Sequence, residues 1–142
     1  MIDKNKIFDL FGSPIQSEKD FIEIASNMLD EPFNKIGMFT KLIINHIIFH
    51  QKLSKFLNQE SNIAMNFEET KRASAFAIFN RAWFYIKQID LKSKNDFEAI
   101  IKFKKEPFLS VLDEAIEYFE GEEEYEKCAK LLEIKKFKEN FP

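Results

Sequence analysis

This chain contains very little glycine and proline: three Gly and four Pro among 142 residues. Because these residue types make most tight turns and strand bends, their scarcity argues against a loop-rich fold. No stretch alternates between apolar and polar residues for long, so no β-sheet is expected. The sequence also lacks a Gly-rich phosphate loop and the G-x-S-x-G turn of hydrolases. The chain is therefore expected to be all-α, with little loop on which to build a catalytic site.

Cysteine and long hydrophobic runs are also scarce. Cys128 is the only cysteine, which excludes an intramolecular disulfide and fits a reducing compartment. No run approaches the roughly 18 apolar residues that a transmembrane helix needs, and the first residues lack the apolar centre of a signal peptide. These features predict a cytoplasmic protein with no membrane partner and no cofactor.

Phenylalanine is the abundant residue type, with 17 in the chain. Phe supplies a large apolar area and no reactive group, so we expect most of these rings to lie at contacts between helices. The length fits one helical domain over residues 1–142. Within it we expect a Phe-rich helical core over residues 1–103 and a C-terminal helical hairpin over residues 106–140.

Caps and helix breakers divide the chain into a bundle of six or seven helices, the last two forming an antiparallel hairpin. The expected helices span 3–11, a segment from 17, 32 to about 57, 66 to about 90, 95 to about 103, 107–121, and 122 to about 139. The two long helices in the middle of the chain carry wide apolar arcs and are expected at the centre of the bundle. The arc of the second includes Phe76 and Phe79, whereas Phe84 is expected to point outward.

His46 and His50 are the only histidines, and their spacing of four residues places both imidazoles on one helix face. This arrangement suits two ligands of one metal ion, with Cys128 as the only further inward-facing donor. The alternative is a pair of core histidines hydrogen-bonded to the backbone or to a hydroxyl group, or a pair lying at the rim of the bundle. A metal- or ligand-binding bundle centred on His46 and His50 is therefore the second hypothesis for function.

Acidic residues are concentrated in residues 106–126, which contain nine Asp and Glu and no basic residue. Asp113, Glu117 and Glu120 share one face of the expected 107–121 helix, opposite its apolar residues. This face either docks a basic partner or is a solvated face that pairs with the lysine-rich segments. The basic segment from Lys71 to Lys105 supports a third hypothesis, a helical subunit of a nucleoprotein complex. Nucleic acid is thus expected as a partner only within a larger assembly.

Arg72 projects near the apolar side of its predicted helix, one turn before Phe76. It either recognises a carboxylate or phosphate, or lays its methylene groups along the apolar surface.

The last predicted helix carries two apolar stripes about 150° apart. One comprises Tyr125, Cys128, Ala129 and Leu132, and the other comprises Ile134, Phe137 and Phe141. One stripe is enough to pack the helix on its own bundle. The second is therefore a candidate surface for a protein partner, for a second copy of the chain in a homo-oligomer, or for the N-terminal helix of the same chain crossing over. A frayed C-terminus is the competing interpretation.

The stretch EEYEKCAKLLEIK, from Glu123 to Lys135, combines an acidic-aromatic start with a short Lys-Ala-Leu pattern. Through these residues, positions 112–136 resemble the UVR-type helical hairpin of nucleotide-excision-repair subunits and some bacterial regulators. The matching positions are Tyr125, Glu126, Lys127, Ala129, Leu131 and Glu133. Cys128 and Leu132 depart from the pattern, which has Ala and Arg there. The resemblance implies a protein-pairing hairpin and no catalytic unit.

Together these patterns predict a non-catalytic protein–protein interaction module that uses an acidic face and a C-terminal aromatic stripe. A small regulator, an adaptor or an assembly subunit would fit this description. The abundance of Ile, Lys, Phe and Asn is typical of AT-rich coding. A phage-encoded, mobile-element or defence-related origin is therefore part of the expectation.

Overall fold

The computed structural model describes residues 18, 19, 22, 31–59 and 67–141. Its helices are α3 (Pro32–Gln59), α4 (Phe67–Ile86), α5 (Lys94–Lys102), α6 (Lys105–Gly121) and α7 (Tyr125–Asn140). This part of the chain contains no strand, which confirms the all-α prediction for it. Five of the expected six or seven helices are seen. The expected helix at 3–11, and nearly all of the one from 17, lie outside the described residues.

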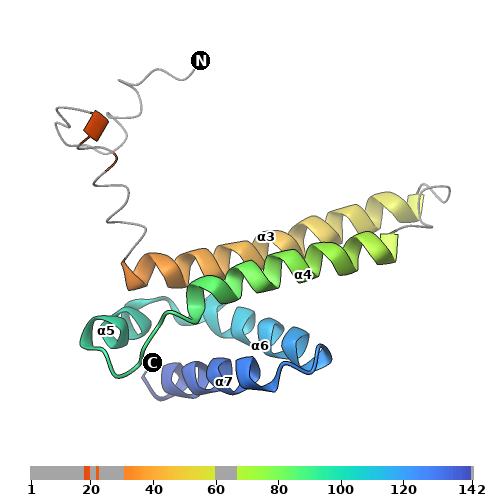
Figure 1. The fold of residues 1–142 in the computed structure, drawn as a ribbon. Coiled ribbons are helices and arrows are strands. Elements are labelled where there is room, and N and C mark those ends of the chain that lie inside the picture. Colours follow the sequence, from red (N-terminus) through yellow and green to blue (C-terminus); the bar gives the residue numbers. More distant parts are fainter. Residues whose placement is uncertain (1–17, 20–21, 23–30, 60–66, 142) are drawn as a thin grey trace.

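The two longest helices, α3 and α4, lie side by side, and α5, α6 and α7 pack along one part of this pair (Figure 1). Helix α3 contacts α5 and α6 as well as α4, while α6 contacts α7. The C-terminal end of α3 and the N-terminal end of α4 extend beyond the other helices (Figure 1). Helix α3 is therefore at the centre of the bundle, as predicted, whereas α4, which was expected to share that place, makes its main helix contact with α3.

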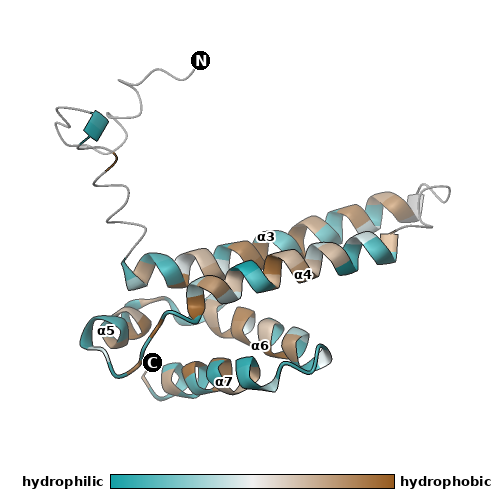
Figure 2. Cartoon of the chain, viewed as in Figure 1, coloured by the Kyte–Doolittle hydropathy of each residue, from teal (hydrophilic) through white to brown (hydrophobic). Residues whose placement is uncertain are grey.

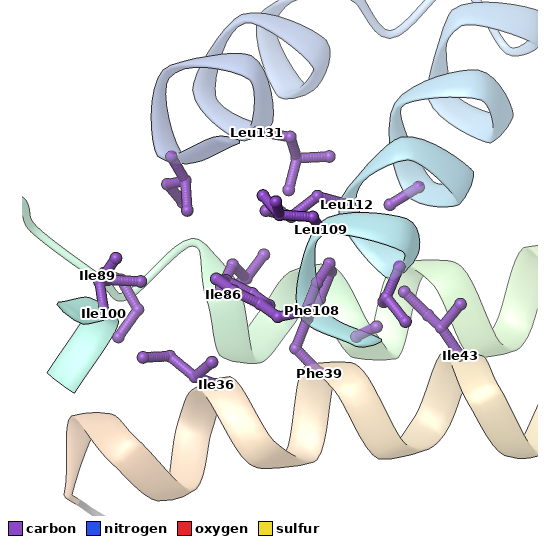
Figure 3. Close-up of a cluster of buried hydrophobic side chains, with 14 of the residues drawn as sticks. Ile36, Phe39, Ile43, Ile86, Ile89, Ile100, Phe108, Leu109, Leu112 and Leu131 are labelled. Atoms are coloured by element: carbon purple, nitrogen blue, oxygen red, sulfur yellow. The ribbon is translucent and has the colours of Figure 1, made fainter. Parts of the chain in front are cut away.

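The hydrophobic core forms where α3 meets α4, α5 and α6. Ile36, Phe39 and Ile43 project from α3 into it, and the Phe39 ring meets the Phe108 ring edge to face at 6.3 Å (Figure 3). On the other side of α6, Leu112 faces Leu131 of α7 (Figure 3). Burial of these side chains stabilises the fold by removing apolar area from water.

Hydrophobic residues recur along α3, α4 and α6, whereas the connection between α6 and α7 is hydrophilic (Figure 2). None of the described helices has the length and apolar character needed to cross a bilayer.

Part of the apolar arcs of α3 and α4 faces solvent, which corrects one expectation. Phe76 was predicted to be buried, yet it is 61% exposed, and Phe49 and Phe56 on α3 are 59% and 53% exposed. The arcs are wider than the surface that the neighbouring helices cover. Phe84, predicted to point outward, is 54% exposed, which confirms that placement.

Helix α4 ends at Ile86, before the predicted end near Asp90. The Gln88 and Ile89 N–H groups donate three residues back, to Tyr85 and Ile86, and side-chain oxygens accept from the backbone beyond them. The Asp90 N–H donates to the Asp96 carboxylate at 2.8 Å, and the Asp90 carboxylate accepts the Lys92 N–H at 3.0 Å. Ser93, and not the predicted Asn95, occupies the N-cap position of α5.

The connection between α6 and α7 differs in one respect from the predicted helix boundary at 121 and 122. Gly121 is the last residue of α6, as predicted, but the left-handed residue is Glu123, with φ 60°. The Glu123 N–H donates to the Glu120 carbonyl at 3.0 Å, and the Glu124 N–H donates to the Phe119 carbonyl at 2.8 Å. These two bonds form a Schellman motif, a common helix C-terminus in which glycine usually takes the left-handed position. Helix α7 consequently begins at Tyr125 and not at 122.

Candidate functional site

The two histidines lie together on α3, as their spacing predicted. The ring centroids of His46 and His50 are 4.3 Å apart, with the rings close to edge-to-face. His46 is half-buried, whereas His50 is only 7% exposed.

Aromatic rings contact both members of this pair. Phe79 of α4 meets the His46 ring at 5.7 Å, while Phe49 and Phe67 lie 5.4 Å and 6.2 Å from the His50 ring. Neither ring nitrogen of His50 has a hydrogen-bond partner within the described part of the chain. Within the described part of the chain, His50 is therefore not a core histidine hydrogen-bonded to backbone or hydroxyl groups.

The surroundings favour uncharged imidazoles. Burial lowers the pKa of both His46 and His50, and the Lys71 ammonium group lowers both further. The pKa of His46 is also lowered by the charge of its neighbour His50. A neutral imidazole has one N–H donor and one acceptor nitrogen, so each ring is able to donate one hydrogen bond to a bound group.

A pocket of about 620 Å³ opens beside the histidines, between α3, α4 and the Glu114 side of α6. Its lining is His46, Ile47, His50, Gln51, Ser54, Lys55, Phe67, Lys71, Ala75, Phe79 and Glu114. The volume falls within the range of roughly 300–1,000 Å³ that is usual for small-molecule sites. We refer to it as the histidine pocket.

The structure does not bring the three candidate metal ligands together. Within residues 31–59 and 67–141, no group of three or more His, Cys, Asp or Glu side chains is placed to hold a metal ion. Cys128 lies between α7 and α6, where its thiol is 3.5 Å from the Ile116 carbonyl oxygen. Burial, together with the charge of Glu120, raises the pKa of this thiol, which keeps it protonated.

All nine acidic residues of positions 106–126 are exposed, and we call them the acidic surface. Asp113 forms an ion pair with Lys135 at 2.6 Å, and Glu124 pairs with Lys127 at 3.4 Å. Glu117 and Glu120 form no ion pair with any described residue. Internal pairing with lysines therefore accounts for only a small part of this charge.

A groove of about 570 Å³ lies beside the acidic surface, between α4 and the end of α6. It is lined by Glu69, Arg72, Ala73, Phe76, Tyr118 and Glu122. We refer to it as the aromatic groove. Burial, with the charges of Glu122 and then Glu124, raises the pKa of Tyr118, which reflects the negative potential here.

Sequence reasoning missed the aromatic groove because it placed Phe76 in the core. The side chain of Tyr118 instead stacks on Phe79 at 4.4 Å and leaves Phe76 exposed. The one sequence signal for this site was Arg72, a cation beside the apolar side of α4.

The second stripe of α7 packs largely against α5. Ile134 is fully buried in the core, and the half-buried Phe137 ring lies 4.8 Å from Phe97 of α5. Phe141 also contacts Phe97, at 5.7 Å, but it is 41% exposed. The second stripe therefore offers a partner only the Phe141 end. The first stripe, expected to pack on the bundle, is the more exposed of the two, with Tyr125 62% and Leu132 40% exposed.

The comparisons with known proteins give no relative from which to infer a function. No family model, no curated protein and no solved structure matches this chain.

Proposed function

We propose that this chain is a non-catalytic protein–protein interaction module whose acidic surface binds a basic segment of a partner protein. A small regulator, an adaptor or an assembly subunit would use it in this way. The observation that carries the proposal is that all nine acidic side chains of positions 106–126 are exposed. Concentrated negative charge repels itself, and a basic partner relieves this repulsion and is steered to the surface.

The aromatic groove supplies an apolar anchor point next to this charge. Phe76 and Tyr118 form its apolar wall, and its charged lining is two carboxylates and one guanidinium group, from Glu69, Glu122 and Arg72. Such a groove suits an apolar or aromatic side chain with Lys or Arg on either side of it, since buried anchors contribute most of the binding energy at protein interfaces.

The pairing of α6 with α7 supports the same proposal. The two helices are in contact and are joined by residues 122–124 only, which suits an antiparallel hairpin. The resemblance of residues 112–136 to the UVR-type hairpin also points to protein pairing. Phe141 at the end of α7 is the remaining candidate for contact with a second copy of the chain.

Affinity capture from the native host tests this proposal with the triple variant Glu117→Gln/Glu120→Gln/Glu122→Gln. We expect the wild-type chain to capture a basic protein at low salt and to release it by about 0.5 M salt, where surface charges are screened. The triple variant should lose most of this capture.

A matched control removes three acidic charges elsewhere, at Glu68, Glu98 and Glu133, and should retain the partner. Equal capture by both triple variants, or a partner whose binding is insensitive to salt, would rule out the acidic surface as the binding face.

A further inference from the structure

We infer that the histidine pocket binds a small organic anion, a carboxylate or phosphate group carried on an apolar body. The anionic group would lie against the two imidazoles and Lys71. This inference does not depend on the function proposed for the acidic surface, from which only Glu114 reaches the pocket lining.

His50 is the first reason. The residue is only 7% exposed, and neither ring nitrogen has a hydrogen-bond partner among the described residues. A buried polar group without a partner costs free energy, and such groups in native proteins usually have a role or a bound partner. A ligand oxygen in the adjoining pocket would accept the hydrogen bond that the ring has available.

The charges around the pocket indicate whether a bound group would be negative or positive. Lys55 and Lys71 line it from α3 and α4, and Glu114 of α6 is the one acidic residue in its lining. Helix α3, which carries both histidines, has no acidic residue along its 28 positions. A metal cation would meet two imidazoles and a repelling ammonium group, whereas an oxyanion accepts hydrogen bonds from all three.

The apolar residues of the pocket indicate what kind of molecule would carry the anionic group. Ile47, Phe67, Ala75 and Phe79 line the same pocket of about 620 Å³, which has ample room for one aromatic ring and a short chain. An inorganic anion alone would leave these walls without contact, so the geometry favours an amphipathic organic ligand.

Nuclear magnetic resonance offers a direct test, because a tag-free chain has only two histidine Hε1 signals. The probes are 4-phenylbutyrate and phenyl phosphate, with the uncharged 4-phenylbutanamide as the reference. Both anions should shift both signals in a saturable way, and the amide should bind more weakly. The tighter of the two anions identifies the preferred head group.

Two variants make the test specific. Lys71→Gln, at an exposed position, should weaken binding of both anions by about tenfold through loss of a charge-assisted hydrogen bond. His50→Phe keeps a ring in place and removes both nitrogens, so it should weaken binding at least as much. Lys41→Gln, an exposed α3 residue outside the pocket lining, is the control and should bind as wild type does.

Three outcomes would overturn the inference. The first is that neither anion shifts the histidine signals at millimolar concentration. The second is that Lys71→Gln binds them as tightly as the Lys41→Gln control. The third is that zinc ions bind the two histidines in the wild-type chain more tightly than either anion does, which would make the pocket a cation site.

Discussion

The ammonium nitrogen of Lys138 lies 2.5 Å from the main-chain carbonyl oxygen of Phe103 and 2.9 Å from that of Ile101. Lys138 is in the last turn of α7 and is only 2% exposed. The two carbonyls belong to the end of α5, where unpaired carbonyl groups carry the negative end of the helix dipole. Burial, and then the charge of Lys105, lowers the pKa of Lys138. These hydrogen bonds from a buried side chain hold the end of α7 against the end of α5.

Lys138→Met should therefore destabilise the fold, because it leaves two carbonyls without their donor. We expect the free energy of unfolding to fall by about 1–3 kcal/mol. Urea denaturation followed by circular dichroism measures this. Lys136→Met, at an exposed position on the same helix, is the matched control and should change stability little. Equal losses in the two variants would show that the carbonyl contacts contribute nothing.

Glu123→Gly should stabilise the protein. Glu123 has φ 60°, a conformation that costs a residue with a side chain roughly 1 kcal/mol relative to glycine. We expect the free energy of unfolding to rise by about that amount in thermal and urea unfolding. The control is Glu122→Gly, where φ is −89° and glycine brings no relief of strain. A gain in both variants would mean that lost negative charge, and not backbone conformation, is responsible.

Acidification should weaken the fold through the two histidines. Because the pKa of each is lowered in the folded state, the unfolded chain binds protons more readily below about pH 6.5. The histidine contribution to stability is therefore complete above that pH and is lost as the pH falls through the lowered folded-state values. Urea midpoints measured between about pH 7.5 and about pH 5.5 should decline.

The double variant His46→Gln/His50→Phe lacks both imidazoles and should show a flatter profile. If the wild-type and double-variant profiles have the same slope, carboxylates and not the histidines control the acid response.

Phe137→Ala should cost more stability than Phe141→Ala. Phe137 is half-buried against Phe97, while Phe141 at the end of the helix is 41% exposed. Truncating a largely buried Phe costs roughly 2–4 kcal/mol, and we expect about 1 kcal/mol or less at the exposed position. Chemical denaturation of both variants provides the comparison. A larger loss at Phe141 would mean that the end of α7 is more tightly packed than this structure indicates.

Local features of the chain were predictable from its residues alone. Gly121 ends α6, and Glu106 has extended backbone angles, so regular helix starts at the predicted Pro107. The shared face of His46 and His50 was predictable, because residues four apart on one helix lie on the same side. The contact between the two rings was left open by the sequence and is shown by the structure. The left-handed conformation of Glu123 was not predictable, because residues that have a side chain rarely adopt it.

The sequence by itself determined the helical character of the described part of the chain, the helix face on which each side chain lies and the clustering of acidic residues in positions 106–126. Only the tertiary structure decided that Ile134 is buried, that Phe76 is exposed, and that His50 adjoins a pocket with Lys71. The physical reason is that helical periodicity sets the direction of a side chain around its own axis. Whether another helix or water lies in that direction depends on how all the helices pack together.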